Sequence, residues 1–299
     1  MNLFKESESV IIFNCNRNDL NLEEFLYTKD ISGRLFRRLY KSKQIYTNGI
    51  FVGKSIKLRS GDIVSLYMDD ENESINPEPI DLDIVFEDND LLILNKPPNI
   101  VVHPTKSHQT NTLSNGIANY FLKNNINKKI RFVNRLDMDT TGILIVAKNS
   151  FAHQQMAIQF EDNTVIKRYL TVVSGYVKSN EDIINEPIGR EDENSIKKVV
   201  SPSGQKALTK YNVIELYKNA TLLEVQIFTG RSHQIRVHLE HIGHPIIGDV
   251  LYNEESPLIK RQALHSNYLK ALHPRTKEEI EFYAPLPNDI SNLIRLLES

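Results

Sequence analysis

The sequence contains little cysteine, no tryptophan and no long apolar run. Its 299 residues include one cysteine, Cys15, so neither a disulfide framework nor a thiolate zinc site can form within the chain. No apolar run approaches the roughly 18–20 residues that a membrane helix needs. The opening segment, MNLFKESESV, carries acids where a signal peptide would be basic and then apolar. We therefore expect a soluble protein of the reducing cytoplasm.

Several common catalytic motifs are also missing from the sequence. It has no GxGxxG segment, no Walker-type glycine loop, no GxSxG elbow and no CxxC pair. These motifs supply the backbone geometry or the nucleophile that dinucleotide-binding proteins, P-loop enzymes and serine hydrolases require. Their absence argues against those three classes.

What is present is an ordinary globular composition with an uneven charge distribution. The chain is 40% hydrophobic and 25% charged, with a net charge of −2, a total that seems to disfavour a nucleic-acid partner. However, residues 20–68 hold nine Lys and Arg against four acids, an excess of five positive charges. Seven acids and no base follow between Asp69 and Asp83. Few contacts would hold so acidic a stretch in a core, so we interpret it as a linker.

The basic segment contains a predicted helix from Ser32, its N-cap, to about Lys41. Apolar residues recur on one face of this helix at Ile31, Leu35 and Leu39. Basic residues recur on another face; they are Arg34, Arg37, Arg38 and Lys41. Such a face is either simply solvated or a contact for a phosphate backbone, and the local excess of positive charge favours phosphate.

The remaining pattern predicts an α+β fold with a mixed, mainly antiparallel sheet and flanking helices. Many short segments of strand character are joined by turns, which favours antiparallel pairing over a doubly wound sheet. We expect buried strands at 83–94 and 142–147, and further strands at 165–173 and around Leu223–Ile227. Helices are expected at 112–122, at 150–160 with Ser150 as N-cap, and at the C-terminus from about Asp289.

The first segment dense in functional side chains runs from Asn134 to Gly142 and leads into a buried strand. It places Asp137 close to Arg135, and a carboxylate beside arginine at the mouth of a strand can stay ionised facing a cleft. A loop capped by that aspartate explains the residues equally well. Asp137 and Asp139 could also share a divalent metal ion, although turn chemistry accounts for both.

The second dense segment runs from Thr229 to Asp249. Ser232 is a candidate helix cap, and Arg236 lies one helical turn further on, where it could pair with a carboxylate. The segment also holds four histidines that suggest zinc: His233, His238, His241 and His244. No HExxH order is present and these spacings do not point to one side, so we disfavour a zinc site.

A third candidate is the Lys167-Arg168-Tyr169 segment on the strand predicted at 165–173. A lone tyrosine on a strand is usually a core residue with its hydroxyl satisfied. The same side chain could instead stack on a nucleobase and handle a proton.

Together, five blocks resemble the RluA/RluD-type RNA pseudouridine synthases. The blocks lie at 83–104, 131–149, 166–175, 228–249 and 261–266, in the order of that family, and they cover most of residues 80–299. The basic N-terminal segment resembles the alpha-L RNA-binding module that many members carry. The resemblance implies domains at 1–70 (alpha-L module) and 83–299 (catalytic domain), with a linker at 71–82.

The resemblance also implies an activity, the isomerisation of uridine in RNA to pseudouridine without cofactor or metal. Asp137 matches the essential aspartate, which acts on the sugar or the base in a way that the resemblance leaves open. Tyr169 matches the tyrosine that stacks on uracil, and Arg236 the arginine that pairs with the aspartate. We expect substrate contacts from four further residues: Arg135, Leu264, Lys167 and Arg231. Arg135 would assist extrusion of the base from its stack.

Two departures and several open points accompany the resemblance. Asn134 stands where many members have histidine, and Thr141 where many have serine. Large-subunit ribosomal RNA is the expected substrate, with transfer RNA as an alternative. A non-catalytic RNA-binding or assembly factor would not need the trio of Asp137, Tyr169 and Arg236. We expect a monomer with no membrane partner, and phosphate contacts from the basic helix that raise the effective RNA concentration at the catalytic domain.

Overall fold

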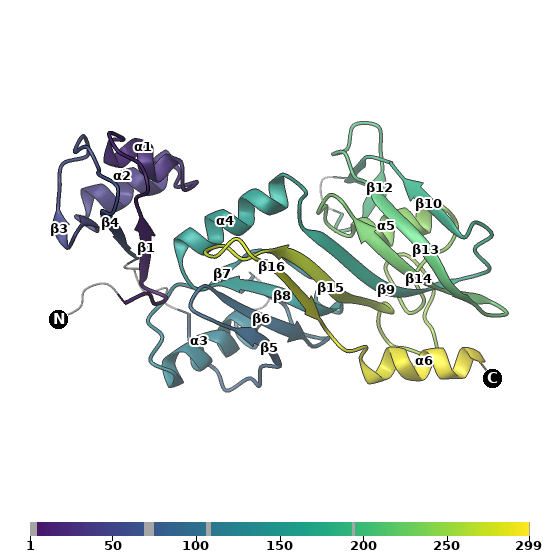
Figure 1. Cartoon of the computed structure of the whole chain (residues 1–299). Coiled ribbons are helices and arrows are strands. Elements are labelled where there is room, and N and C mark those ends of the chain that lie inside the picture. The colour runs from purple at the N-terminus through teal and green to yellow at the C-terminus, as the bar shows by residue number, and fades with distance from the viewer. Residues whose placement is uncertain (1–4, 69–74, 106–108, 193–194, 299) are drawn as a thin grey trace.

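The computed structural model describes residues 5–68, 75–105, 109–192 and 195–298. A small sheet with two helices lies at one end of the molecule, and one large sheet runs through the rest (Figure 1). Within the described residues the helices are α1 (Leu22–Tyr27), α2 (Gly33–Lys41), α3 (Leu113–Lys123), α4 (Ser150–Glu161), α5 (Gln234–His241) and α6 (Asn288–Glu298). None of these is long and apolar enough to cross a membrane.

In the part of the chain that the structure describes, the strands form three sheets. The small sheet has the spatial order β1 (Val10–Asn14), β4 (Ile63–Tyr67), β2 (Ile45–Thr47) and β3 (Ile50–Phe51). The large sheet has the order β10 (Glu181–Ile184), β13 (Thr209–Leu216), β14 (Ala220–Ile227), β9 (Ile166–Ser174), β15 (Leu264–Leu272), β8 (Thr141–Ala147), β6 (Leu91–Lys96) and β5 (Ile84–Glu87), with β16 (Glu279–Tyr283) on β15 and β7 (Arg131–Phe132) on β8. A two-stranded sheet pairs β11 (Ile188–Arg190) with β12 (Lys198–Val200).

The predicted α+β class with a mainly antiparallel sheet is confirmed. Neighbouring strands of the large sheet pair antiparallel except β8 and β15, which run parallel with Thr141 beside His265 and Gly142 beside Ser266. At this crossing the two backbones lie very close. A Cβ on Gly142 would come within 2.1 Å of the Ser266 carbonyl oxygen, and its φ of +108° also favours glycine. The close approach brings the loop before β8 against the start of β15.

Alternation along the strands gives the large sheet two buried faces. In β6, Leu92 and Leu94 pack in a cluster with residues of α3, α5 and α6, whereas Leu91 and Ile93 pack in a second cluster with Met156 of α4. All four leucine and isoleucine side chains are at most 1% exposed. Burial of such side chains stabilises the fold by about 1.5–3 kcal/mol each. The helices on both faces therefore hold the sheet that carries the site.

Three local predictions differ from the structure. Residues 83–94 form the hairpin of β5 and β6 rather than one strand, because the Asp88 carboxylate accepts hydrogen bonds from the backbone N–H groups of Asp90 and Leu91 and closes a turn. The N-cap of α4 is Asn149, not Ser150, since the Asn149 side chain accepts from the Ala152 N–H. The N-cap of α5 is His233 rather than Ser232, and it makes no side-chain capping bond.

The N-terminal segment, residues 5–68, is docked on the large-sheet part of the chain. Phe151 of α4 is 1% exposed and lies within the apolar cluster of the small sheet, with its ring 5.9 Å from that of Phe13. Ser32 donates from its hydroxyl to Gln154 Oε1 of α4 (2.9 Å), and Gln154 in turn donates to the Asp30 carbonyl oxygen (2.6 Å). The two parts thus share one packed interface.

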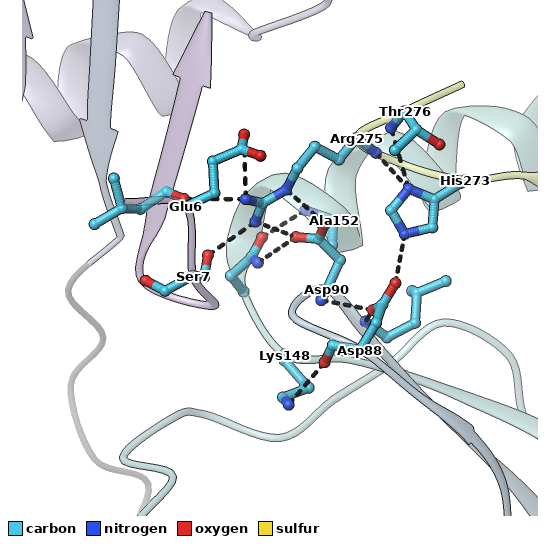
Figure 2. Close-up of polar contacts among 12 residues, drawn as sticks. Glu6, Ser7, Asp88, Asp90, Lys148, Ala152, His273, Arg275 and Thr276 are labelled. Carbon is cyan, nitrogen blue, oxygen red and sulfur yellow. Dashed lines mark hydrogen bonds and ion pairs between the residues drawn. The ribbon is translucent and has the colours of Figure 1, made fainter. Parts of the chain in front are cut away.

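The Arg275 side chain joins the two parts beside this interface (Figure 2). Arg275 donates from Nε and Nη2 to the two carboxylate oxygens of Asp90, at 2.7 and 2.8 Å, and Asp90 is 1% exposed. The same guanidinium donates to the carbonyl oxygens of Ser7 (2.9 Å) and Val10 (3.1 Å) in the N-terminal segment. Arg275 therefore connects the β5–β6 turn to the start of β1.

The acidic stretch is less free than the sequence suggests. Residues 69–74 lie outside the described residues, but residues 75–83 pack along α3. The Glu78 N–H donates to the Asn115 carbonyl oxygen (3.0 Å), and the Asn115 side chain donates to the Asn76 carbonyl oxygen (2.8 Å). The expectation of few contacts is therefore wrong over this part of the stretch, because Asn115 of α3 bonds its backbone through both its side chain and its carbonyl oxygen.

Candidate active site

A cavity of about 1010 Å³ opens over the large sheet where β8, β9 and β15 meet. Its walls come from the loop before β8, from β9, from the start of β15 and from the segment leading into α5. The residues predicted as catalytic or substrate-binding all line it: Asp137, Tyr169, Arg236, Arg135, Leu264, Lys167 and Arg231. The structure thus brings together residues from four separate parts of the sequence.

The loop that carries Asp137 is held by two buried cations. Lys96, which is 0% exposed at the end of β6, donates from Nζ to the carbonyl oxygens of Met138 (2.6 Å) and Thr140 (3.0 Å). Arg261 donates from Nη1 to the Asp139 carbonyl oxygen (2.9 Å). Burial lowers the pKa of Lys96 to about 7. These bonds fix the loop backbone, so that the Asp137 carboxylate, 32% exposed, faces the cavity.

Arg236 of α5 links Asp137 to a second, buried carboxylate. Its Nη1 donates to Asp137 Oδ2 at 2.9 Å, while Nε and Nη2 donate to the two oxygens of Asp249 at 2.6 and 2.7 Å. Asp249 is 1% exposed, and the Tyr252 ring centroid lies 5.0 Å from the guanidinium carbon. Burial alone lowers the pKa of Arg236, but hydrogen bonds and charges from Asp249 and Asp137 raise it above its ordinary value. Arg236 is thus a permanently charged, oriented partner for Asp137.

Tyr169 and Leu264 form apolar walls on neighbouring strands. Tyr169 on β9 is 7% exposed, and Leu264 at the start of β15 is 3% exposed. Leu264 pairs with Thr171, two residues after Tyr169. Burial raises the pKa of Tyr169 to about 12, and the charge of Asp137 adds to this rise. The phenol therefore keeps its proton at neutral pH, and its ring is available to stack on a planar base.

Three further cations line the cavity in different settings. Lys167 on β9 is 6% exposed with its ammonium 5.1 Å from the Phe160 ring centroid, and burial lowers its pKa. Arg231 is exposed but donates to the Lys206 carbonyl oxygen (3.0 Å) and to Gln205 Oε1 (3.1 Å). Arg135 is exposed at the cavity wall. Four basic side chains, those of Arg135, Lys167, Arg231 and Arg236, thus line the cavity against two carboxylates, those of Asp137 and Glu161, a balance that suits an anionic ligand.

The basic helix α2 lies apart from this cavity. Its four predicted RNA-binding side chains are exposed: Arg34, Arg37, Arg38 and Lys41. However, Arg38 donates from Nη2 to the Ser150 hydroxyl oxygen at 2.5 Å, so it also belongs to the interface with α4. The basic face is therefore only partly directed away from the rest of the molecule.

The histidines near α5 do not converge on one point. His238 bonds Thr209 Oγ1 and the Glu186 carbonyl oxygen, whereas His244 bonds the Ser174 carbonyl oxygen. His233 bonds the Tyr252 hydroxyl. The Asp139 carboxylate accepts from the Asn99 N–H, whereas the Asp137 carboxylate accepts from Arg236. Within the described ranges, no three His, Cys, Asp or Glu side chains are placed to hold a metal ion.

Four residues of the site were not assigned a role from the sequence: Lys96, His233, Asp249 and Tyr252. Asp249 closes the second dense segment, but nothing in residue order says that its partner is Arg236. Lys96 lies about 40 residues before the loop that it supports, so no local spacing indicates the contact. Asn134, which replaces the usual histidine, has a structural role, because it bonds the backbone of Ile143 and Ile145 in β8.

Comparisons with known proteins show the family of the chain. The family model described as RNA pseudouridylate synthase matches residues 90–241, which contain Asp137, Tyr169 and Arg236. The uncharacterized RNA pseudouridine synthase YjbO of Bacillus subtilis is 37% identical over 279 residues, covering 92% of this chain and 99% of that protein. The chain belongs to the RNA pseudouridylate synthase family. It is an RluA/RluD-type member, an enzyme that isomerises uridine in RNA.

Two more relatives support the family and its fold. The ribosomal large subunit pseudouridine synthase D of Haemophilus influenzae is 34% identical over 258 residues, covering 81% of this chain and 79% of that protein. The solved structure of human RNA pseudouridylate synthase domain containing 1 is 26% identical with a TM-score of 0.57, covering 77% of this chain and 98% of that one. These similarities show that the chain has the fold of a pseudouridine synthase.

Proposed function

We propose that this synthase acts on uridine in large-subunit ribosomal RNA and uses Asp137 as its central reactive group. The observation that carries the proposal is the Asp137–Arg236–Asp249 chain of ion pairs at the cavity. Similarity to proteins named ribosomal large subunit pseudouridine synthase D supports the choice of RNA. A transfer RNA target is the alternative outcome of the experiment below.

The reaction requires that the N-glycosidic bond breaks, that the base turns, and that its carbon 5 joins the anomeric carbon. Arg236 keeps Asp137 ionised and aimed at the target nucleotide. Asp137 then attacks the sugar or the base, or removes a ribose proton; all three routes need an ionised carboxylate. Tyr169 holds the uracil by stacking and is a candidate to handle the carbon-5 proton. Because its phenol is protonated at neutral pH, the phenol oxygen can accept that proton only as its own proton leaves.

The target nucleotide must enter a walled cavity to reach Asp137. We propose that it is extruded from its stack and that Arg135, at the exposed wall, occupies the space beside it. Leu264 and Tyr169 then bound the base, and Lys167 and Arg231 contact the flanking backbone. The apolar walls favour a neutral uracil ring, while the surrounding cations favour its phosphates.

We further propose that residues 1–70 form an alpha-L RNA-binding module whose basic helix contacts phosphates, and that residues 83–299 form the catalytic domain. The separate apolar cluster of the small sheet supports such a division. Phe151 and Arg275 contact this module, so we expect it to be held at a fixed position on the catalytic domain rather than on a loose tether.

The test is to map pseudouridine in total RNA from cells with and without the gene. We expect one or more sites in large-subunit ribosomal RNA to lose pseudouridine in the deletion strain and to regain it with the wild-type gene. Loss confined to transfer RNA would correct the substrate. An unchanged map in every RNA class would contradict the proposed function.

A further inference from the structure

His233 lies in the active-site cavity beside Asp137, and the chemistry above gives it no role. Its Nε2 is 3.9 Å from Asp137 Oδ2, which is too long for a hydrogen bond. The imidazole is 18% exposed and forms part of the cavity wall. A group bound against Asp137 would therefore also lie within reach of Nε2.

The backbone of His233 is held in an uncommon conformation. With φ of 58° and ψ of 17°, the residue is left-handed, which only a few per cent of non-glycine residues are. It occupies the N-cap position of α5 without making a capping bond, so helix capping does not explain the choice of residue. Such a conformation at the edge of a site points to a role for the side chain.

Tyr252 fixes which ring nitrogen of His233 carries the proton. The Tyr252 hydroxyl accepts from the Lys198 N–H at 2.8 Å and lies 2.9 Å from His233 Nδ1. Burial raises the pKa of Tyr252 to about 12, so the hydroxyl keeps its own proton and needs an acceptor. In the described part of the chain, Nδ1 is the acceptor within bonding distance of that hydroxyl. Nδ1 is then the lone-pair nitrogen, and Nε2 carries the hydrogen.

The charges around the ring agree with a neutral imidazole whose Nε2–H faces the carboxylate. Burial lowers the pKa of His233, as do the charges of Arg236 and Lys198, while Asp137 and Asp249 oppose them. The pKa stays below its ordinary value, so the ring is neutral at neutral pH. A lone pair at Nε2 would be repelled by the Asp137 carboxylate, whereas an N–H is attracted.

We propose that His233 is a further catalytic residue, whose Nε2–H donates a hydrogen bond to a uracil carbonyl oxygen, and that Tyr252 is its positioning residue. The inference rests on the proposed function. When the N-glycosidic bond breaks, its electron pair leaves with the base, and the negative charge spreads onto the carbonyl oxygens. His233 stabilises that charge and keeps its own proton throughout. When carbon 5 has joined the sugar, carbon 5 loses its proton and N1 gains one.

A pair of amide substitutions separates this role from a structural one. The His233→Asn side chain suits the left-handed backbone but is too short to place a donor at Nε2. The His233→Gln side chain reaches that position but suits the backbone less well. The donor role predicts that His233→Asn lowers kcat about 100-fold with little change in KM, while His233→Gln stays within about tenfold of wild type. A purely structural role predicts the opposite order, and that order would overturn the proposal.

Nitrogen-15 NMR of the imidazole supplies a readout that does not depend on activity. The wild-type protein is expected to show the Nε2–H tautomer. The Tyr252→Phe variant is expected to lose this fixed tautomer and part of kcat. Its circular dichroism spectrum should show that the overall fold is retained. A fixed Nδ1–H tautomer in the wild type would refute the inference. Ribosomal RNA from cells lacking the gene distinguishes the two failures. If the wild-type protein forms no pseudouridine in this RNA, the proposed function is wrong and the inference falls with it. If the wild-type protein forms pseudouridine and His233→Asn is fully active, only the inference is wrong.

Discussion

At the scale of single residues, the site depends on charge pairs of different burial. Asp137 is one-third exposed at the cavity, whereas Asp249 behind Arg236 is shielded from water. A buried ion pair is costly to break, because the remaining charge is left without a partner. The pair of Lys210 and Glu181 lies at the surface, with the Glu181 side chain 65% exposed, so breaking this pair costs little stability.

Replacing Asp249→Asn should therefore reduce both activity and stability. The guanidinium of Arg236 would lose one of its two negative partners and its fixed orientation. We expect kcat/KM to fall at least tenfold and the free energy of unfolding to fall by about 3 kcal/mol. Steady-state kinetics and urea unfolding measure the two effects. Glu181→Gln is the matched control, with an expected change below about 1 kcal/mol; equal effects of the two variants would refute the account.

Buried histidines should make the stability depend on pH. Burial lowers the pKa values of His238 and His265, both 0% exposed, and that of His233. Between those lowered pKa values and the ordinary value of about 6.5, the unfolded chain binds more protons than the folded one. The stabilisation is thus complete above about pH 7 and is lost as the pH falls through these pKa values.

Urea unfolding between pH 7.5 and 5.5 checks this prediction. Each group contributes up to about 1.4 kcal/mol per pH unit where the folded and unfolded proton occupancies differ fully. His238→Gln should flatten the slope by its share. A free energy of unfolding that is constant or rises on acidification would show that burial does not suppress protonation of these rings.

At the scale of secondary-structure elements, the sequence predicts periodic segments well and their ends less well. Helix α2 begins after Ser32 as predicted, because the Ser32 hydroxyl accepts the Leu35 N–H. The cap of α4 was placed one residue late, since Asn149 and Ser150 are both good caps and only the tertiary bond of Asn149 to Asp90 distinguishes them. The β5–β6 hairpin was missed, although the polar residues Glu87 to Asp90 interrupt the apolar pattern there and Asp88 closes the turn.

The docking of β1 on the large-sheet part should depend on Arg275. Arg275→Ala would leave the buried carboxylate of Asp90 without its main cation. We expect the free energy of unfolding to fall by about 3 kcal/mol and amide exchange in β1 to become faster than in β8. Hydrogen exchange with mass spectrometry measures both strands. Arg295→Ala on the exposed side of α6 is the control; unchanged exchange in β1 of Arg275→Ala would show that the ion pair does not hold the segment.

At the scale of the whole molecule, the net charge of −2 is the sum of basic and acidic regions that are unevenly distributed along the chain. Basic residues are concentrated on α2 and around the cavity, and in the sequence between them residues 69–83 hold seven acids and no base. The sequence predicted the residues around the cavity because the blocks of the family carry them. It did not predict the docking of residues 5–68, because Phe151 and Arg275 lie far apart in the chain and have no local pattern that marks an interface.

Because the N-terminal segment is docked, charge removal tests its RNA contact better than truncation, which would expose Phe151. A triple Arg34→Gln, Arg37→Gln, Lys41→Gln variant keeps the apolar side of α2. A plot of the logarithm of the affinity for ribosomal RNA against the logarithm of the salt concentration should have a slope that is less negative by about 2–3. Filter binding at 50–200 mM KCl measures it. Replacing Lys178, Lys218 and Lys260, which are exposed elsewhere, is the control; an equal loss of slope there would mean non-specific attraction.

The most direct test of the central claim is the activity of Asp137→Asn. Asparagine keeps the size of the side chain and removes the negative charge that Arg236 pairs with. Pseudouridine formed in ribosomal RNA from cells lacking the gene is measured together with RNA affinity. We predict that the wild type forms pseudouridine while Asp137→Asn binds the RNA within a few-fold and forms none. Conversion by Asp137→Asn at the wild-type rate would contradict the account.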